Sequence, residues 1–161
     1  MIRALLRRLL RFARNDFSMM EDFMKISAQV KNGLGQHQVT LRTNDHVHSL
    51  EIPPKELGFG SSANGGELLC LALATCYCND LYREAAKWGI RVEWVEVSVD
   101  AEFGGEGDAA KSINYQAKVR AQASEDDIRA LMTHTDKVAE IQNTLRGAMP
   151  VTLSNIEVIS V

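Results

Sequence analysis

The segment from Gly66 to Trp88 most constrains the fold of this chain, because it combines helical length with an almost wholly apolar first half. A helix that is apolar nearly all round, as between Leu68 and Cys78, must be buried on most sides. The second half carries charged residues at helical spacing and reaches solvent, and Gly89 follows where a helix commonly ends. A sheet covers only one side of such a helix, so we expect a homodimer in which a partner subunit supplies further cover.

Alternation of apolar and polar residues predicts strands on both sides of this helix. The clearest alternation covers residues 95–103 and 113–123. The outer face of the first strand is acidic and that of the second is basic, which favours an antiparallel pair. Upstream of the helix, shorter alternations predict three strands at 24–31, 37–43 and 46–52.

Turn and cap residues complete the predicted order of elements. Asn32-Gly33 and Asn44-Asp45 predict tight turns between the upstream strands. Ser124 predicts the start of a second helix, which residues 140–146 either extend or break. Residues 151–161 predict a final strand, with a bulge where the alternation slips. The order β-β-β-α-β-β-α-β indicates an α+β fold with a mostly antiparallel sheet and two main helices.

Length and charge limit the domain count and the partners. A chain of 161 residues is expected to form one domain, here residues 24–161 behind a basic N-terminal extension at 1–23. Residues 1–20 hold five arginines and one aspartate, a charge of +4, which leaves −7 for the remainder. An acidic body of this kind excludes nucleic acid as a partner of its folded surface.

The N-terminal residues 1–12 are basic and amphipathic and lack the apolar core of a secretory signal. They could lie on an anionic membrane surface, or the true start could be Met19, Met20 or Met24. No apolar run reaches transmembrane length, so no integral membrane segment is expected. Three cysteines within nine residues do not form a secreted disulfide framework. These features together favour the cytoplasm.

Helical geometry separates the three cysteines. Cys76 and Cys78 point about 200° apart around a helix axis, and Cys70 lies roughly 12 Å from Cys78 along it. These separations exclude an internal disulfide while the segment is helical, and they argue against a metal site made from the thiols. A helical thiol can be core packing or a nucleophile, and reactivity requires a cationic or hydrogen-bonding neighbour.

Several parts of the chain resemble the OsmC/Ohr family. They are the segment 58–69, the helix that continues to Cys76, the end of that helix at 85–90, the two long alternating strands, and residues 142–145. The resemblance covers roughly residues 25–161. It implies an intertwined homodimer with active sites at the subunit interface. It also implies reduction of organic hydroperoxides by a helical cysteine, which becomes a sulfenic acid and is resolved by a second cysteine. Cys76 matches the attacking cysteine.

The rest of the family's machinery matches poorly, which indicates a divergent branch. Ala139 occupies the position of the resolving cysteine, and Gly66 occupies that of the activating glutamate. Glu67 is adjacent but turned about 100° around the helix. The family's arginine stretch offers only Lys55, although Arg42 in the preceding strand could reach a neighbouring subunit. Arg42 and Glu67 are therefore the predicted activators.

Each of the other candidate residues can be explained by a structural or solvent-exposed role as well as by a functional one. His46 and His48 share a strand face and are interpreted as exposed, since two ligands do not make a metal site. His134 could approach Cys76 and lower its pKa, or be a solvated helix residue. Tyr77 and Asn143 are predicted to line the pocket. Asp136 and Glu140 are interpreted as solvated carboxylates.

The sequence therefore predicts an OsmC-like reductase of organic hydroperoxides in oxidative-stress defence, with Cys76 as its sole nucleophile and an external thiol as reductant. No cofactor and no metal are expected. The alternative is a non-catalytic dimer that keeps the fold and binds a small apolar ligand.

Overall fold

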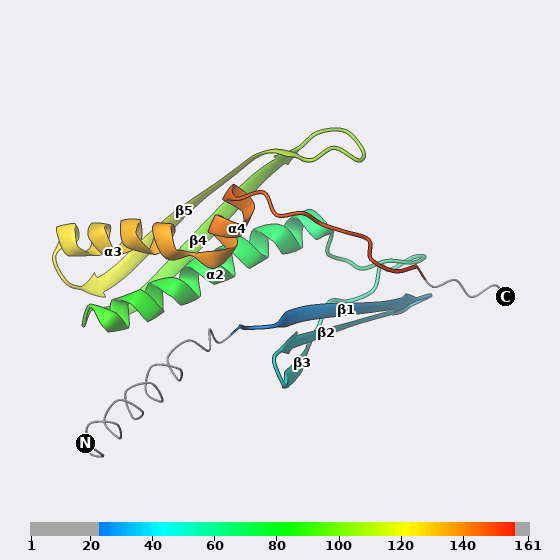
Figure 1. The fold of residues 1–161 in the computed structure, drawn as a ribbon, viewed down its shortest axis with the longest axis horizontal. Helices are drawn as coiled ribbons and strands as arrows, with labels where there is room; N and C mark the ends of the chain where they lie inside the picture. The colour runs from blue at the N-terminus through cyan, green and yellow to red at the C-terminus, as the bar shows by residue number, and fades with distance from the viewer. Residues whose placement is uncertain (1–22, 157–161) are drawn as a thin grey trace, which may run out of the picture. The chain divides into compact units, whose positions relative to one another are not determined.

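The structure of the protein is a computed structural model that describes residues 23–156. The predicted α+β class is confirmed, with two small antiparallel sheets (Figure 1). The predicted extension at 1–23 lies almost wholly outside the described residues. In chain order the elements are β1 (Ile26–Gly33), β2 (Gln36–Thr43), β3 (His46–Leu50), α2 (Gly65–Lys87), β4 (Arg91–Phe103), β5 (Ala110–Gln122), α3 (Glu125–Val138) and α4 (Glu140–Arg146).

The chain divides into two compact units, residues 1–62 and 63–161, and each is described by itself. The first unit holds an antiparallel sheet in the order β1-β2-β3. The turn at Asn44-Asp45 forms as predicted, with Asn44 at φ 50°. The turn predicted at Asn32-Gly33 is wrong by two residues, because both residues stay in β1 and the chain reverses after them at a glycine with φ 65°, Gly35.

The side chain of Asn32 explains the displaced turn. Its amide nitrogen donates to the carbonyl oxygens of Gln36 (2.9 Å) and Gly60 (3.2 Å). Its amide oxygen accepts from the Gly60 nitrogen at 2.9 Å. Asn32 thus holds the loop that follows β3, so its side chain is committed to tertiary hydrogen bonds rather than to a turn.

One face of the β1–β3 sheet carries exposed apolar side chains on its edge strands. Because side chains alternate along a strand and paired residues share a face, the register places Ile26, Val30 and Leu50 on the same side. Their exposed fractions are 66%, 58% and 38%. Val39 of the central strand lies on the same face and is 9% exposed. Within the first unit, the exposed apolar side chains of this face thus lie on the edge strands β1 and β3.

The second unit is built around α2, whose start and end follow from local chemistry. Asn64 caps the helix: its side-chain oxygen accepts from the Glu67 nitrogen at 3.0 Å, and Glu67 accepts from the Asn64 nitrogen at 2.7 Å. This reciprocal pair is a capping box. Gly89 takes φ 69° just after the helix, a conformation that glycine adopts without strain. The predicted helix is confirmed.

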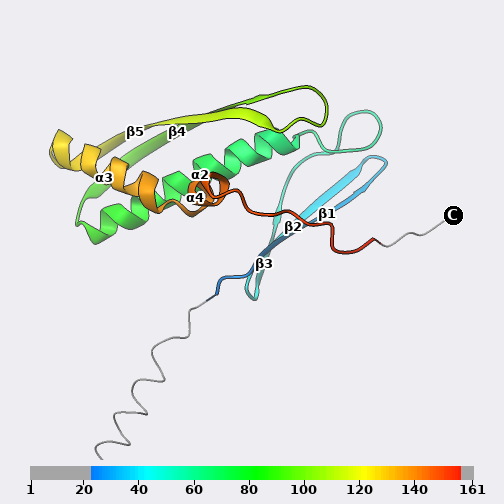
Figure 2. The same cartoon turned by 45° about the horizontal axis from the view of Figure 1, so that its top comes forward.

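α2 lies along the β4–β5 hairpin, with α3 beside it, in both views (Figure 2). The core between them consists of Tyr77, Leu81, Ala85 and Leu131, all nearly inaccessible to solvent. The predicted charge match across the hairpin is present, since the Lys118 ammonium lies 3.2 Å from the Glu96 carboxylate. α2 is thus fixed on one side by a sheet and on another by a helix.

The chain breaks its helix at Ala139, which is fully buried and extended (φ −70°, ψ 113°). α3 begins at the predicted cap, where Ser124 accepts from the Asp127 nitrogen at 3.2 Å. Residues 140–146 form the separate helix α4. The predicted final strand is wrong over 151–156, which carry no strand pairing, and residues 157–161 lie outside the described part. Within residues 23–156, no helix has the length and apolar character needed to cross a membrane.

Candidate functional site

The thiol of Cys76 shares one face of α2 with Asp80. Residues four apart on a helix are neighbours, and here the Cys76 sulfur donates to Asp80 Oδ2 across 3.3 Å. Asp80 is 5% exposed, whereas Cys76 is half-buried. The thiol therefore has a proton acceptor on its own helix and an open side toward solvent.

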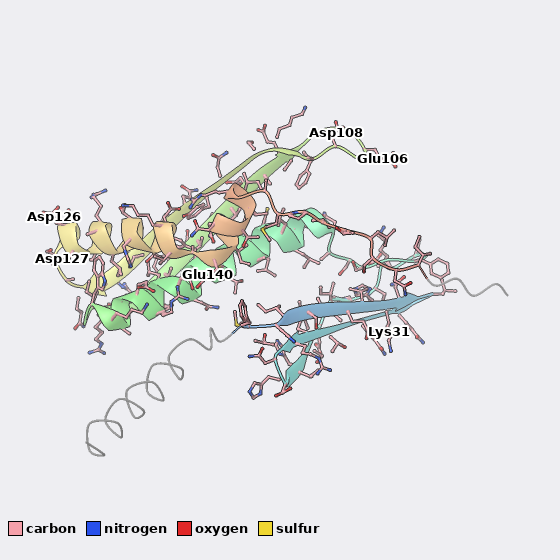
Figure 3. All side chains as sticks on the ribbon, in the orientation of Figure 1. Lys31, Glu106, Asp108, Asp126, Asp127 and Glu140 are labelled. Atoms are coloured by element: carbon pink, nitrogen blue, oxygen red, sulfur yellow. The ribbon has the colours of Figure 1, made fainter. Side chains whose placement is uncertain are left out.

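Glu140, labelled in Figure 3, is the first residue of α4 and brings a second carboxylate to the same thiol. Its Oε2 lies 3.9 Å from the Cys76 sulfur. The backbone N–H of the next residue, Ile141, also hydrogen-bonds to the sulfur. Both approaches depend on the break at Ala139, which turns the chain after α3 back toward α2.

Arg83 pairs with the outer oxygens of both carboxylates. Its Nη1 lies 2.8 Å from Asp80 Oδ1 and 3.1 Å from Glu140 Oε1. Each carboxylate therefore presents one oxygen to the guanidinium and the other to the thiol. This arrangement fixes the orientation of both acids, because guanidinium–carboxylate hydrogen bonds are directional.

The electrostatics of the cluster favour the protonated thiol. The pKa of Cys76 is raised overall, and burial of the thiol is the largest cause. The hydrogen bond from the Ile141 amide lowers this pKa. The hydrogen bond and charge of Asp80 and the charge of Glu140 raise it further. Burial and Glu140 also raise the pKa of Asp80, although Cys76 and Arg83 oppose them. Burial alone would raise the pKa of Glu140, but its backbone amide, Asp80 and Arg83 lower it overall. The pKa of Glu140 is therefore lowered, whereas the pKa values of Cys76 and Asp80 are raised.

A second charged cluster surrounds Glu84, whose side chain is 4% exposed. Lys87 and Arg83 reach it at 2.8 and 2.9 Å, and His134 of α3 reaches it at 3.2 Å. Hydrogen bonds from Lys87, then Arg83, lower the pKa of Glu84 to about 2. His134 also stacks against Trp88, with ring centroids 5.2 Å apart. This cluster joins α2 to α3 and shares only Arg83 with the Cys76 cluster.

The family of the chain follows from comparison with known proteins. The family model described as OsmC-like protein matches residues 58–154, more than half of the chain. The chain belongs to this family. The OsmC-like match includes α2 with Cys76 and α4 with Glu140, so the whole cluster lies inside the family domain. A search of curated proteins found no match.

Solved structures agree with this assignment at the level of the fold. An OsmC-like protein from Mycoplasma pneumoniae matches with 18% identity and a TM-score of 0.57, over 80% of this chain and 90% of its own. An OsmC-like protein of unknown function from Vibrio cholerae matches with 14% identity and a TM-score of 0.54, over 76% and 94%. An organic hydroperoxide resistance protein from Bacillus subtilis matches with 18% identity and a TM-score of 0.47, over 78% and 91%. The likeness to the Mycoplasma pneumoniae and Vibrio cholerae proteins shows the OsmC-like fold alone.

Among the other predicted site residues, Glu67, Tyr77 and Asn143 have roles of their own apart from the thiol. Glu67 serves the helix cap, about 13 Å along the axis from Cys76. Tyr77 lies in the core, where it donates to the Met132 carbonyl at 2.9 Å. Asn143 is exposed and donates to the Lys137 carbonyl at 2.9 Å. Arg42 lies on β2, in the unit that is described separately from α2.

The remaining candidates are three histidines and the three cysteines. His46 and His48 are exposed on β3. Cys70, Cys76 and Cys78 are all free, each with intermediate exposure. His134 pairs with Glu84, two turns further along α2 than Cys76.

Sequence reasoning missed Asp80 and Arg83, and it interpreted Glu140 as a solvated surface acid. The spacing of Asp80 from Cys76, and of Arg83 from Asp80, could have shown that all three share a face of the helix. No comparable signal exists for Glu140, because 64 residues separate it from Cys76.

Proposed function

We propose that this OsmC-like protein reduces organic hydroperoxides with Cys76 as its only nucleophile and an external thiol as reductant. One observation carries the proposal: the half-buried thiol donates a hydrogen bond to a nearly buried carboxylate, 3.3 Å away, on its own helix. Nucleophilic catalysis by a thiol needs a base within such a distance. The family resemblance supplies the substrate class, and the cytoplasm is the proposed place of the activity.

The proposed first step transfers the thiol proton from Cys76 to Asp80 while the sulfur attacks the outer oxygen of the hydroperoxide. The O–O bond breaks, the sulfur is oxidised to a sulfenic acid, and the alcohol oxygen leaves. Asp80 returns the proton to that oxygen, so that an alcohol rather than an alkoxide is released. Arg83 keeps the acceptor oxygen of Asp80 turned toward the sulfur.

The second step restores the thiol with reducing equivalents from outside the chain. One external thiol condenses with the sulfenic acid to a mixed disulfide and releases water. A second external thiol breaks this bond and leaves Cys76 reduced, together with an external disulfide. Ala139 stands where the resemblance places a resolving cysteine, and helical spacing separates Cys70 and Cys78 from Cys76, so the reductant is external.

We infer that the active form is a homodimer. The exposed apolar side chains on β1 and β3, which are Ile26, Val30 and Leu50, support this inference, because large apolar faces are covered in functional assemblies. A partner subunit is also the proposed source of Arg42, which would add positive charge near the sulfur. An apolar pocket at that interface would accept the carbon chain of the hydroperoxide.

A second function is favoured by the charge around the thiol. Burial and two carboxylates raise the pKa of Cys76, whereas efficient thiol enzymes lower it. A non-catalytic dimer that binds a small apolar ligand has no need of a thiolate and would tolerate these acids. The two functions differ in whether Cys76 is oxidised by a hydroperoxide faster than a free thiol.

The test uses the full chain, reduced and treated with a chelator. An alkyl hydroperoxide is added with an excess of a dithiol, and peroxide loss is followed beside sulfenic acid trapping by mass spectrometry. We expect oxidation at Cys76, loss of activity in Cys76→Ser, and retained activity in the matched variants Cys70→Ser and Cys78→Ser. Peroxide loss no faster than with the dithiol alone would reject the peroxidase and favour the binding protein.

A further inference from the structure

Three metal-binding atoms converge where α2 meets α4: the Cys76 sulfur, Asp80 Oδ2 and Glu140 Oε2. The sulfur lies 3.3 Å from the Asp80 oxygen and 3.9 Å from the Glu140 oxygen. All three atoms lie within 4.8 Å of one another. The cluster combines a thiol with two carboxylates and draws them from two helices that are distant in sequence.

The separations fit a tetrahedral metal ion. Zinc binds thiolate sulfur at about 2.3 Å and carboxylate oxygen at about 2.0 Å. At tetrahedral angles these bond lengths put a sulfur and an oxygen ligand about 3.5 Å apart, and two oxygens about 3.3 Å apart. The observed sulfur–oxygen distances lie on either side of the ideal value. The two carboxylate oxygens lie within 4.8 Å of each other, so a bound ion would draw them toward the ideal separation.

Arg83 holds the acids as an outer partner of metal ligands would. It pairs with Asp80 Oδ1 and Glu140 Oε1, which are the oxygens that face away from the sulfur. Hydrogen bonds of this kind orient ligating groups and tune their affinity. The inner oxygens are left to face the thiol and any ion between them.

The charges of the cluster also match a divalent cation. With the thiol and both acids ionised, the three groups carry three negative charges, and Arg83 compensates one of them. A divalent ion compensates the other two. Because the sulfur is a soft ligand, the set suits zinc and similar transition metals, whereas magnesium and calcium require oxygen ligands.

We propose that Cys76, Asp80 and Glu140 bind a divalent transition-metal ion of the zinc type, with a fourth position open to solvent. Metal binding is not a redox step. The ion replaces the proton of the thiol, which is released to solvent, and it also replaces any proton on Asp80. The site goes beyond the proposed peroxidase and does not depend on it. An ion bound to the sulfur would block attack on a peroxide, so metal and substrate would compete for Cys76.

The test titrates reduced, metal-free full-length protein with Zn²⁺ by calorimetry, and with Co²⁺ as an absorbing probe. We expect one ion per chain and a thiolate-to-cobalt charge-transfer band with the visible bands of tetrahedral Co²⁺. The band should vanish in Cys76→Ser and remain in Cys70→Ser and Cys78→Ser. Arg83→Gln should keep the band and weaken the affinity about 10–100-fold, as for an outer partner.

Glu140→Gln keeps the test decisive, because this side chain is 61% exposed and its replacement leaves the core intact. We expect at least a tenfold weaker affinity, roughly the loss of one ligand's share of binding. Absence of saturable binding by the wild-type chain overturns the proposal. So does binding with unchanged affinity in both Cys76→Ser and Glu140→Gln. Since the peroxidase test is done in chelator, failure of one proposal leaves the other standing.

Discussion

Removal of the negative charge of Glu140 should make the Cys76 thiol more acidic and more reactive. The pKa of Glu140 is lowered, and its negative charge is one cause of the raised pKa of Cys76. Glu140→Gln keeps the size of the side chain and removes the charge. It also leaves Arg83 with one carboxylate fewer, which shifts the thiol pKa in the same direction.

The distance sets the size of the effect. Charges on the sulfur and on Glu140 Oε2, 3.9 Å apart, interact by about 1 kcal/mol in water and about 4 kcal/mol at an effective dielectric constant of 20. The lower value applies, because the Glu140 side chain is 61% exposed. Since one pKa unit corresponds to about 1.4 kcal/mol, we expect the thiol pKa to fall by about 0.8.

The assay is the pH dependence of alkylation by iodoacetamide, in a Cys70→Ser/Cys78→Ser background so that only Cys76 reacts. A fall of about 0.8 raises the thiolate fraction at neutral pH about sixfold. A less basic thiolate is also a weaker nucleophile, so the alkylation rate itself should rise about threefold. The protein is kept in chelator throughout.

Glu106→Gln is the matched control, because it makes the same substitution in the exposed hairpin loop between β4 and β5. It should leave the alkylation profile unchanged. An equal shift in both variants would show that only net charge matters. No shift in Glu140→Gln would refute the inferred contact between Glu140 and the sulfur.

Two further predictions concern stability. Leu81→Ala removes a side chain with 0% exposure from the core and should lower the free energy of unfolding in urea by about 2–5 kcal/mol. The control is Leu57→Ala, at a site that is 89% exposed. An equally small loss in both variants would contradict the inferred core. The pKa of Glu84 is lowered to about 2, with the hydrogen bond from Lys87 as the largest cause. The ionised form of Glu84 therefore stabilises the fold above its pKa in the unfolded chain, about 4.3. This stability is lost as the pH falls toward about 2. Glu84→Gln should flatten the dependence of the urea midpoint on pH across this range, and an unchanged slope would count against it.

The elements that could be predicted from the sequence are those whose signals are local. The ends of α2 are marked in the sequence by Asn64, Glu67 and Gly89, because capping residues act within one turn of a helix end. The β4–β5 hairpin follows from alternation and from charges that face each other, as Glu96 and Lys118 do. Such signals need no knowledge of the rest of the chain.

The features that the sequence did not predict depend on contacts between residues that are distant in the chain. Asn32 has the residue type of a turn, but its side chain bonds to Gly60, which only the folded chain brings near. The apolar alternation after Pro150 is typical of a strand, yet residues 151–156 pair with no strand among residues 23–156. Glu140 reaches Cys76 only because α3 packs on α2 and the chain bends at Ala139. A pattern within the sequence contains none of these contacts.

The bend at Ala139 makes the site more sensitive to chain length than to amino-acid type. Substitution of exposed residues of α3 should leave this helix in place, because it is anchored by Leu131 and Thr135. A residue inserted or deleted between Val138 and Glu140 would move the carboxylate and the Ile141 amide away from the sulfur together. During divergence, we therefore expect this junction to accept substitutions and to reject insertions and deletions.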